Sequence, residues 1–139
     1  MSNRTINIGL CGFGVVGQGV YDHLNSKRQA LRELLGADMS VTRIAVRDLS
    51  KKRDVEVDES SLSNDPIAIA TDPGIDIVCE LMGGTEIARQ VTIAALRAGK
   101  IVVTANKALL CDHGRELLSI AQEFGGHLLF EASVAGVFQ

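Results

Sequence analysis

The sequence contains no tryptophan, only two prolines and three cysteines, and aromatic residues make up 4% of its 139 residues. No two cysteines have Cys-x-x-Cys spacing, which argues against a zinc site and against thioredoxin-type redox chemistry. We interpret the cysteines as free thiols in a reducing compartment. No apolar run reaches the roughly 18 residues that a membrane-spanning helix needs, and Met1–Thr5 is too short and polar for a signal peptide. We therefore expect a cytoplasmic protein that does not enter a membrane.

The chain also lacks a strong excess of charge of either sign. Its 14 lysines and arginines against 17 aspartates and glutamates give a net charge of -3 at pH 7, so we expect no nucleic-acid partner. Hydrophobic residues make up 46% of the chain, and because aromatics are few, the apolar bulk is aliphatic, as buried parallel strands prefer. The length suits one domain, spanning residues 1–139, that can bury a core without disulfides or a structural metal.

Predicted strands and helices alternate along the chain, which indicates an α/β fold built on a parallel sheet. We predict strands over residues 6–11, 41–47, 75–81 and 100–103, and a last strand that begins at 128. We predict helices over residues 15–35, from Pro66 onward, over 85–98, and over 106–124 with a break or kink near His113. The polar stretch 48–63 predicts a loop or a marginal element.

A glycine-rich turn lies between the first predicted strand and the first predicted helix. It reads Gly12-Phe13-Gly14-Val15-Val16-Gly17, which is the Gly-x-Gly-x-x-Gly pattern of dinucleotide-binding sites. In that pattern the first glycine permits the tight turn, the second lets a pyrophosphate approach the backbone, and the third allows helix and strand to pack closely. The pattern favours a Rossmann-type, doubly wound, mostly parallel sheet with helices on both faces. The alternative is that the glycines serve only the turn and its packing.

The end of the second predicted strand bears on the choice between NAD and NADP. A basic residue at this place accommodates the extra phosphate of NADP, whereas an acidic residue binds the ribose hydroxyls of NAD. Arg47 can offer a bidentate fork to a phosphate, but Asp48 follows it directly. We predict a preference for NADP and keep NAD as possible. The run Lys51-Lys52-Arg53 either supports that preference or is a solvated loop.

Three later strand ends carry further candidate residues, because ligands of open α/β sheets bind beyond the carboxyl ends of the strands. Gly83 and Gly84 allow a ligand to touch the backbone. Thr104 and Lys107 follow the next strand, and Lys107 is placed to orient a carbonyl or relay a proton near the nicotinamide, unless it is an ordinary solvated lysine. The small residues after Phe130 suit a crowded domain junction.

The sequence resembles homoserine dehydrogenase across nearly its whole length. Four segments carry the resemblance, and they occur in the family's order: residues 8–17 (IGLCGFGVVG), 76–84 (DIVCELMGG), 99–109 (GKIVVTANKAL) and 130–136 (FEASVAG). The first segment is shared by many dehydrogenases, whereas the other three together are much more specific.

The resemblance implies the reversible reduction of aspartate semialdehyde to homoserine by NAD(P)H, on the route to threonine, methionine and isoleucine. It also implies site residues. By the family's pattern the pyrophosphate is surrounded by Phe13, Gly14, Val15 and Val16, and the adenosine phosphate is contacted by Arg47. The same pattern places Thr104 and Lys107 near the nicotinamide ribose, with Lys107 at the catalytic centre, and a sodium ion between Glu131, Val134 and Gly136.

The chain departs from the family in two ways. Family members continue into a substrate and dimerisation domain, and they tend to follow the VAG segment with Gly-Ile-Pro rather than with the Val137-Phe138-Gln139 found here. We therefore expect a fragment that binds coenzyme without useful turnover, and a full enzyme that is a homo-oligomer. The alternatives are another Rossmann semialdehyde dehydrogenase or reductase, a non-catalytic NAD(P)-sensing module, and a unit that associates through surfaces normally covered by the missing domain.

Overall fold

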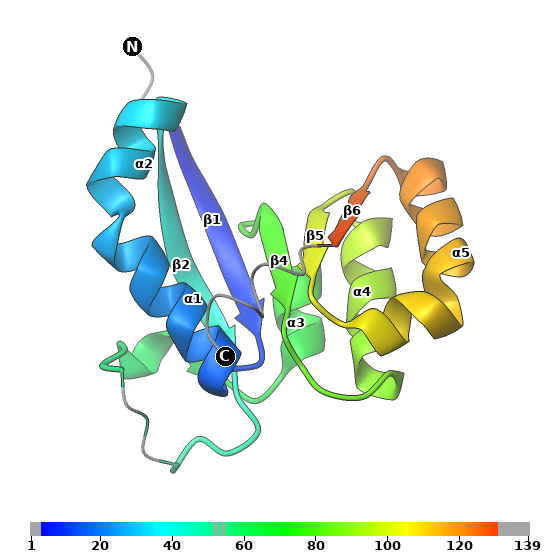
Figure 1. Ribbon diagram of the computed structural model, residues 1–139, viewed down its shortest axis with the longest axis horizontal. Coiled ribbons are helices and arrows are strands. Elements are labelled where there is room, and N and C mark those ends of the chain that lie inside the picture. Colours follow the sequence, from blue (N-terminus) through cyan, green and yellow to red (C-terminus); the bar gives the residue numbers. More distant parts are fainter. Residues whose placement is uncertain (1–3, 52, 54, 131–139) are drawn as a thin grey trace.

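The computed structural model describes residues 4–51, 53 and 55–130 of the chain (Figure 1). Strands and helices alternate in it as the sequence predicts. In chain order the elements are β1 (Arg4–Cys11), α1 (Val15–Ser26), α2 (Arg28–Leu35), β2 (Ala37–Ala45), the single 3-10 turn η1 (Glu59–Ser61), β3 (Leu62–Ser63), α3 (Pro66–Thr71), β4 (Ile77–Glu80), α4 (Glu86–Arg97), β5 (Ile101–Thr104), α5 (Lys107–Phe124) and β6 (His127–Phe130). None of the described helices is both long enough and apolar enough to cross a membrane.

The six strands form one sheet in the order β3-β2-β1-β4-β5-β6, and every neighbouring pair is parallel. The chain builds outward from β1 to β3, then crosses back and builds outward from β4 to β6. The direction of winding therefore reverses between β1 and β4, which is where doubly wound sheets bind their ligands. This topology confirms the predicted Rossmann-type fold class.

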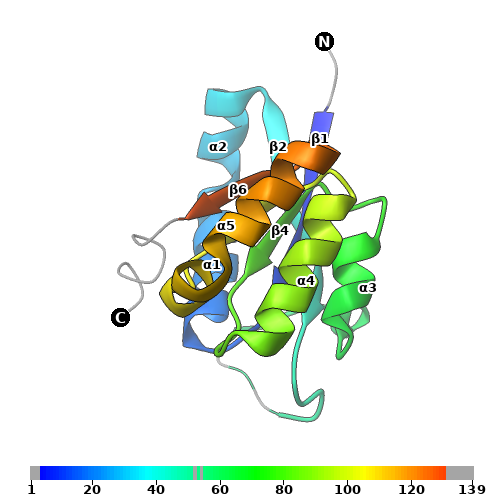
Figure 2. The ribbon, with the colours of Figure 1, turned by 90° about the vertical axis from the view of Figure 1, so that its right-hand side faces the viewer.

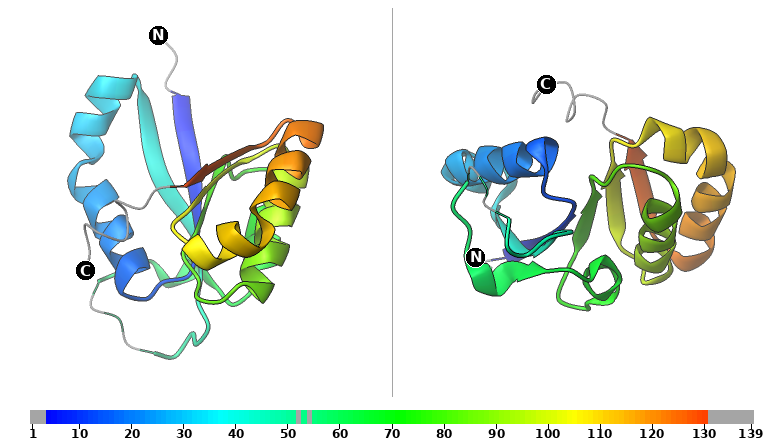
Figure 3. Two further views of the ribbon diagram at one scale, coloured as in Figure 1. Left: turned by 45° about the vertical axis from the view of Figure 1, so that its right-hand side comes forward. Right: turned by 90° about the horizontal axis from the view of Figure 1, so that it is seen from below.

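Helices cover both faces of the sheet, as predicted. Successive strand residues point to opposite faces, so Leu10 and Ile44 belong to one apolar cluster whereas Cys11 and Ala45 belong to the other. The helix α1 covers the first face, and α3, α4 and α5 lie side by side over the second (Figures 2 and 3). Two apolar clusters thus pack the strands between helices and fix where their carboxyl ends lie.

Two predicted helix and strand boundaries are wrong near the start of the chain. The predicted helix over residues 15–35 is two helices that meet at Lys27, and α2 buries none of its residues. Leu31 is half-buried, and Arg28 and Arg32 form ion pairs with Asp38 of β2. The strand predicted from residue 41 begins at Ala37, because its polar first residues pair with β1 along the sheet.

The helix predicted over residues 106–124 with a break or kink near His113 has no break, because α5 runs without interruption from Lys107 to Phe124, although its first turns lie at an angle to the rest of the helix (Figure 1). Its buried stripe consists of Leu109, Leu117 and Ala121, which pack on the core from both sides of Gly114. A glycine inside a helix lowers its stability by only about 1 kcal/mol, and the free energy gained by burying this apolar stripe is larger. Within the stretch 48–63, predicted as a loop or a marginal element, the structure has η1 and the two-residue strand β3.

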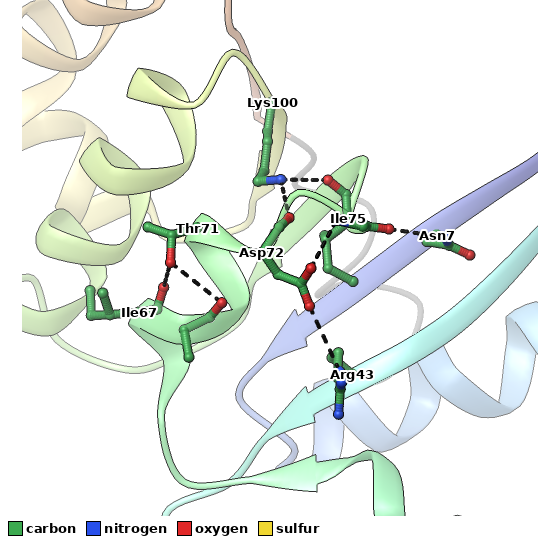
Figure 4. Close-up of polar contacts among 9 residues, drawn as sticks. Asn7, Arg43, Ile67, Thr71, Asp72, Ile75 and Lys100 are labelled. Carbon is green, nitrogen blue, oxygen red and sulfur yellow. Dashed lines mark hydrogen bonds and ion pairs between the residues drawn. The ribbon is translucent and has the colours of Figure 1, made fainter.

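A buried lysine joins two turns at the end of the sheet opposite the glycine turn (Figure 4). Lys100, directly before β5, is 7% exposed, and its Nζ donates to the carbonyl oxygens of Asp72 at 2.5 Å and Ile75 at 2.6 Å. The Asp72 carboxylate in turn lies 3.9 Å from the guanidinium of Arg43 in β2. These contacts tie the α3–β4 turn to β5 and β2, away from the candidate site.

Candidate functional site

A cleft of about 1010 Å³ opens at the carboxyl ends of the strands, at the point where the winding reverses. Four segments line it: the turn after β1 with Gln18 of α1, the end of β2 with the residues that follow it as far as Arg53, the start of α3 at Asn64 and Pro66, and residues 81–87 from the end of β4 into the first turn of α4. Both halves of the sheet therefore contribute walls. Of the predicted site residues, the cleft brings together Gly12, Phe13, Gly14, Arg47, Gly83 and Gly84.

The glycines of the turn differ in how much space surrounds them. Gly12 has φ +111°, a region that favours glycine, and a Cβ on it would lie 2.7 Å from the carbonyl oxygen of Leu81. A Cβ on Gly17 would collide with the carbonyl oxygen of Gly12, so the helix can approach the strand only with glycine there. Gly14 is exposed, and nothing lies within 4 Å of the place where its Cβ would be. The turn is thus tight on its inner side and open on the cleft side.

The helix α1 begins at the edge of the cleft, with Gly14 in the cleft lining. Gly14 is the N-cap, and no described side chain caps the helix there. A helix start leaves its first N–H groups without intrahelical partners, and together with the helix dipole they attract an anion. Val15 and Val16 belong to the first turn of α1, but their side chains do not line the cleft, and Val15 is 76% exposed. The ring of Phe13 packs edge-on against Tyr21, and Phe13 is buried.

Basic side chains line the far wall of the cleft. Arg47 is exposed there, and no described residue forms an ion pair with it. The guanidinium of Arg53 donates to two backbone carbonyls, that of Lys51 at 2.7 Å and that of Asp48 at 2.5 Å. Arg53 therefore braces the loop, while Arg47 keeps its donors for a ligand. Lys52 lies outside the described residues.

The carboxylate of Asp48 is engaged within its own loop. It accepts the backbone N–H of Ser50 at 2.9 Å and the hydroxyl of Ser50 at 2.7 Å. Those hydrogen bonds lower the pKa of Asp48, with smaller contributions from Arg53 and Lys51. Asp48, the acidic residue next to Arg47, is thus an anion whose Oδ1 already accepts hydrogen bonds from Ser50.

The wall formed by Gly83 and Gly84 is held by a chain of hydrogen bonds at the ends of β4 and β5. The fully buried Glu80 accepts the backbone N–H of Met82 at 2.8 Å and the hydroxyl of Thr104 at 2.7 Å. Burial raises the pKa of Glu80, and the hydrogen bonds from Thr104 and Met82 oppose that rise. The Thr104 hydroxyl also accepts the backbone N–H of Asn106 at 3.0 Å.

Five predicted site residues lie outside the lining of the cleft, namely Val15 and Val16, described above, and Thr104, Lys107 and Gly17. Thr104 is fully buried, with its hydroxyl given to Glu80. Lys107 is exposed as the first residue of α5, directly after the N-cap Asn106. Gly17 serves the packing of helix on strand rather than the surface of the cleft.

The predicted sodium ligands, Glu131, Val134 and Gly136, lie outside the described residues. Within residues 4–51, 53 and 55–130 no group of three or more histidine, cysteine, aspartate or glutamate side chains is arranged to hold a metal ion. Burial raises the pKa of both Cys11 and Cys79 to about 12, so neither thiol forms a nucleophilic thiolate near neutral pH.

Sequence reasoning missed three residues that shape the cleft. Gln18 donates from its side chain to the carbonyl oxygen of Phe13 at 3.1 Å. Glu80 and Asn106 hold the Gly83–Gly84 wall from beneath and from the side. Two features of the sequence could have indicated Glu80 and Asn106. An acidic residue at the end of an apolar strand needs partners because an isolated buried charge is costly, and asparagine is a preferred N-cap at a predicted helix start.

A doubly wound parallel sheet, a bare glycine turn at a helix start and a cleft at the reversal of winding together define a dinucleotide-binding Rossmann domain. Residues 12–131 match the family described as "Homoserine dehydrogenase, NAD binding domain", and the chain belongs to this family.

Relatives and solved structures agree with that assignment. The chain is 40% identical over 133 residues to homoserine dehydrogenase of Bacillus subtilis, which covers 96% of this chain and 31% of the relative. It is 43% identical over 131 residues to homoserine dehydrogenase of Corynebacterium glutamicum, covering 94% of this chain and 29% of the relative. A crystal structure of S. aureus homoserine dehydrogenase superposes with a TM-score of 0.88 at 39% identity, over 95% of this chain and 33% of that one. The chain thus spans about a third or less of these relatives.

Proposed function

We propose that the cleft binds NADP(H), with the pyrophosphate at the glycine turn and the adenosine phosphate at Arg47. The observation that carries the proposal is that an open backbone turn at the start of α1 and an arginine without an ion-pair partner among the described residues line the same cleft. The turn supplies N–H donors to a diphosphate, and Arg47 supplies a charged fork to a further phosphate. NADP(H) carries both groups, and NAD(H) carries only the first.

The preference for NADP(H) is supported by the charges on the wall that Arg47 and Asp48 share. A carboxylate that is free at this position would accept the two ribose hydroxyls of NAD(H) and repel a phosphate. Here Oδ1 of the Asp48 carboxylate accepts two hydrogen bonds from Ser50, and three basic residues, Arg47, Lys51 and Arg53, line the same wall. The basic side chains of this wall outnumber its one acidic side chain, and this excess of positive charge favours the phosphorylated coenzyme.

We extend the proposal to the reaction of the enzymes to which the chain is similar, the interconversion of aspartate semialdehyde and homoserine. The bound coenzyme supplies or accepts a hydride at the carbon of the substrate's aldehyde or alcohol group. When the aldehyde is reduced, its oxygen becomes an alkoxide and takes up one proton. Lys107, exposed at the start of α5, is the residue of this chain that we assign to orient that oxygen and to relay the proton. Thr104 supports the same end of the cleft from the core.

Three expectations remain proposals. We assign the sodium ion to Glu131, Val134 and Gly136, whose oxygens suit a hard monovalent cation. We assign the chain to a single coenzyme-binding domain over residues 1–139 of a longer enzyme. We also expect that longer enzyme to self-associate.

Titration calorimetry of the chain with NADPH and with NADH tests the coenzyme site. We expect both to bind and NADPH to bind more tightly. Replacing Arg47 with alanine removes a charge-assisted contact of about 1.5–3 kcal/mol, which corresponds to a loss of roughly ten- to hundredfold in NADPH affinity and little loss for NADH. Arg115→Ala, an exposed arginine of α5 that does not line the cleft, is the matched control.

Two results would contradict the proposal. Folded protein that takes up neither coenzyme would remove the binding site altogether. Equal losses of NADPH and NADH affinity in Arg47→Ala, or tighter binding of NADH by the unchanged protein, would remove the assignment of Arg47 to the extra phosphate.

A further inference from the structure

One carboxamide joins two parts of the cleft that are far apart in the sequence. The Nδ2 of Asn106 donates to the carbonyl oxygen of Gly84 at 2.6 Å and lies 3.5 Å from that of Met82, its weaker second acceptor. The Oδ1 of the same side chain accepts the backbone N–H of Leu109 at 3.0 Å. Asn106 is thus both the N-cap of α5 and a clamp on the cleft wall.

The orientation of this carboxamide is fixed by chemistry. Only its oxygen can accept the N–H of Leu109, so its nitrogen necessarily faces the carbonyl oxygens of the wall. The backbone N–H of Asn106 is itself tied to Thr104, and through Thr104 to the buried Glu80. Glu80 closes the ring by accepting the N–H of Met82. The hydrogen bonds of this ring connect the end of β4, the loop after it, the end of β5 and the N-cap of α5.

The wall needs such an anchor because its own residues cannot stiffen it. Gly83 and Gly84 have no side chains to pack, and nothing lies within 4 Å of either Cβ position. Gly84 also has φ +79°, a conformation that glycine adopts but does not hold by itself. A free loop would have to be ordered when ligand binds, and that ordering lowers affinity.

We propose that Asn106 is a positioning residue that fixes the Gly83–Gly84 wall relative to Lys107. The proposal deepens the coenzyme site and rests on it. Lys107 directly follows Asn106 at the helix start, so one side chain sets both the wall and the place from which Lys107 projects. Coenzyme lying against the wall is thereby held at a defined distance from the residue assigned to the substrate oxygen.

Three substitutions separate the clamp from the helix cap. Asn106→Asp keeps a good capping oxygen but places a second oxygen against the carbonyl of Gly84. Asn106→Ser also caps a helix, adds no charge and is too short to reach the wall. Asn106→Ala removes both functions. Asn25→Asp, on the exposed end of α1, makes the same chemical change away from the cleft and is the matched control.

Each variant of the chain is measured for NADPH affinity by calorimetry, for thermal midpoint, and for amide hydrogen exchange over residues 82–85 and 107–110. Loss of one net hydrogen bond corresponds to about a tenfold change in affinity. We expect Asn106→Asp and Asn106→Ser to bind NADPH about tenfold more weakly, to exchange faster over residues 82–85, and to retain protection over 107–110. A purely structural cap would leave both properties of these two variants unchanged.

The outcomes separate this inference from the coenzyme proposal. Normal NADPH binding and normal exchange of residues 82–85 in Asn106→Ser, with defects only in Asn106→Ala, would show that the cap alone matters and would overturn the inference. If the unchanged chain bound no coenzyme, the proposed function would fail, and exchange over residues 82–85 would still decide whether Asn106 anchors the wall.

Discussion

Lys100 provides a sharp test of how the sheet is held together at the end away from the cleft. Its ammonium is buried and donates to the carbonyl oxygens of Asp72 and Ile75 (Figure 4). Replacing Lys100 with methionine keeps an unbranched side chain of similar length and removes the charge and both hydrogen bonds. The backbone N–H of Ile75 still donates to the carbonyl of Asp72, so the carbonyl of Ile75 loses most.

The expected cost follows from opposing contributions. Two hydrogen bonds from a charged donor contribute about 1.5–3 kcal/mol each. Burying the ammonium costs several kcal/mol, and the methionine variant is relieved of that cost. We expect a net loss of about 2 kcal/mol in the free energy of unfolding. For a chain of this length that corresponds to a fall in Tm of roughly 6–10 °C.

Urea unfolding and calorimetric melting of Lys100→Met measure this loss directly. Lys27→Met, an exposed lysine between α1 and α2, is the control and is expected to change the free energy of unfolding by no more than about 0.5 kcal/mol. A Lys100→Met protein as stable as the unchanged chain, or more stable, would refute the reasoning. It would show that desolvation of the ammonium cancels the bonds it makes.

Two further predictions concern stability. Thr92 is fully buried in α4, and its hydroxyl has no hydrogen-bond partner among the described residues. Replacing Thr92 with valine should therefore raise the free energy of unfolding, measured by urea titration, by about 1 kcal/mol. A lower free energy of unfolding would mean that the hydroxyl does make a hydrogen bond. Arg28 and Arg32 flank Asp38, and the hydrogen bond from Arg28 lowers the pKa of Asp38 from 3.8 to about 2. The stability that this carboxylate contributes is therefore present above about pH 4 and is lost as the pH falls toward 2; Arg28→Gln should flatten that part of the stability curve, and an unchanged curve would contradict the assignment.

The fold could be predicted because each of its main determinants is local. A strand, a glycine turn and an amphipathic helix follow one another within residues 6–24, and the alternation of such units implies a parallel sheet. The break at Lys27 could not be predicted, because the apolar spacing continues through it and only the distant Asp38 shows why α2 is held separately. The uninterrupted course of α5 through Gly114 likewise depends on core contacts made on both sides of that residue.

The candidate site likewise has a part that could be predicted from local sequence and a part that could not. The glycine turn and Arg47 are adjacent in sequence to the elements that position them, and the structure places them in one cleft. The clamp of Asn106 on Gly84 joins residues 22 positions apart, and the bond from Thr104 to Glu80 joins residues 24 apart. Neither contact could be predicted from the spacing of residues along the sequence. The roles of Thr104 and Lys107 at the nicotinamide end remain predictions, since Thr104 is buried and Lys107 does not line the cleft.

The two halves of the sheet are joined at a short seam, where β1 and β4 pair over only four residues, Ile8–Cys11 with Ile77–Glu80. A coenzyme lying across the crevice would touch both sides of this seam and act as a removable bridge between them. Because the unfolded polypeptide has no such crevice, a free ligand concentration one hundredfold above Kd would add about 2.7 kcal/mol of protection against unfolding. The lifetime of the polypeptide under proteolysis would then rise and fall with the size of the cell's nicotinamide nucleotide pool.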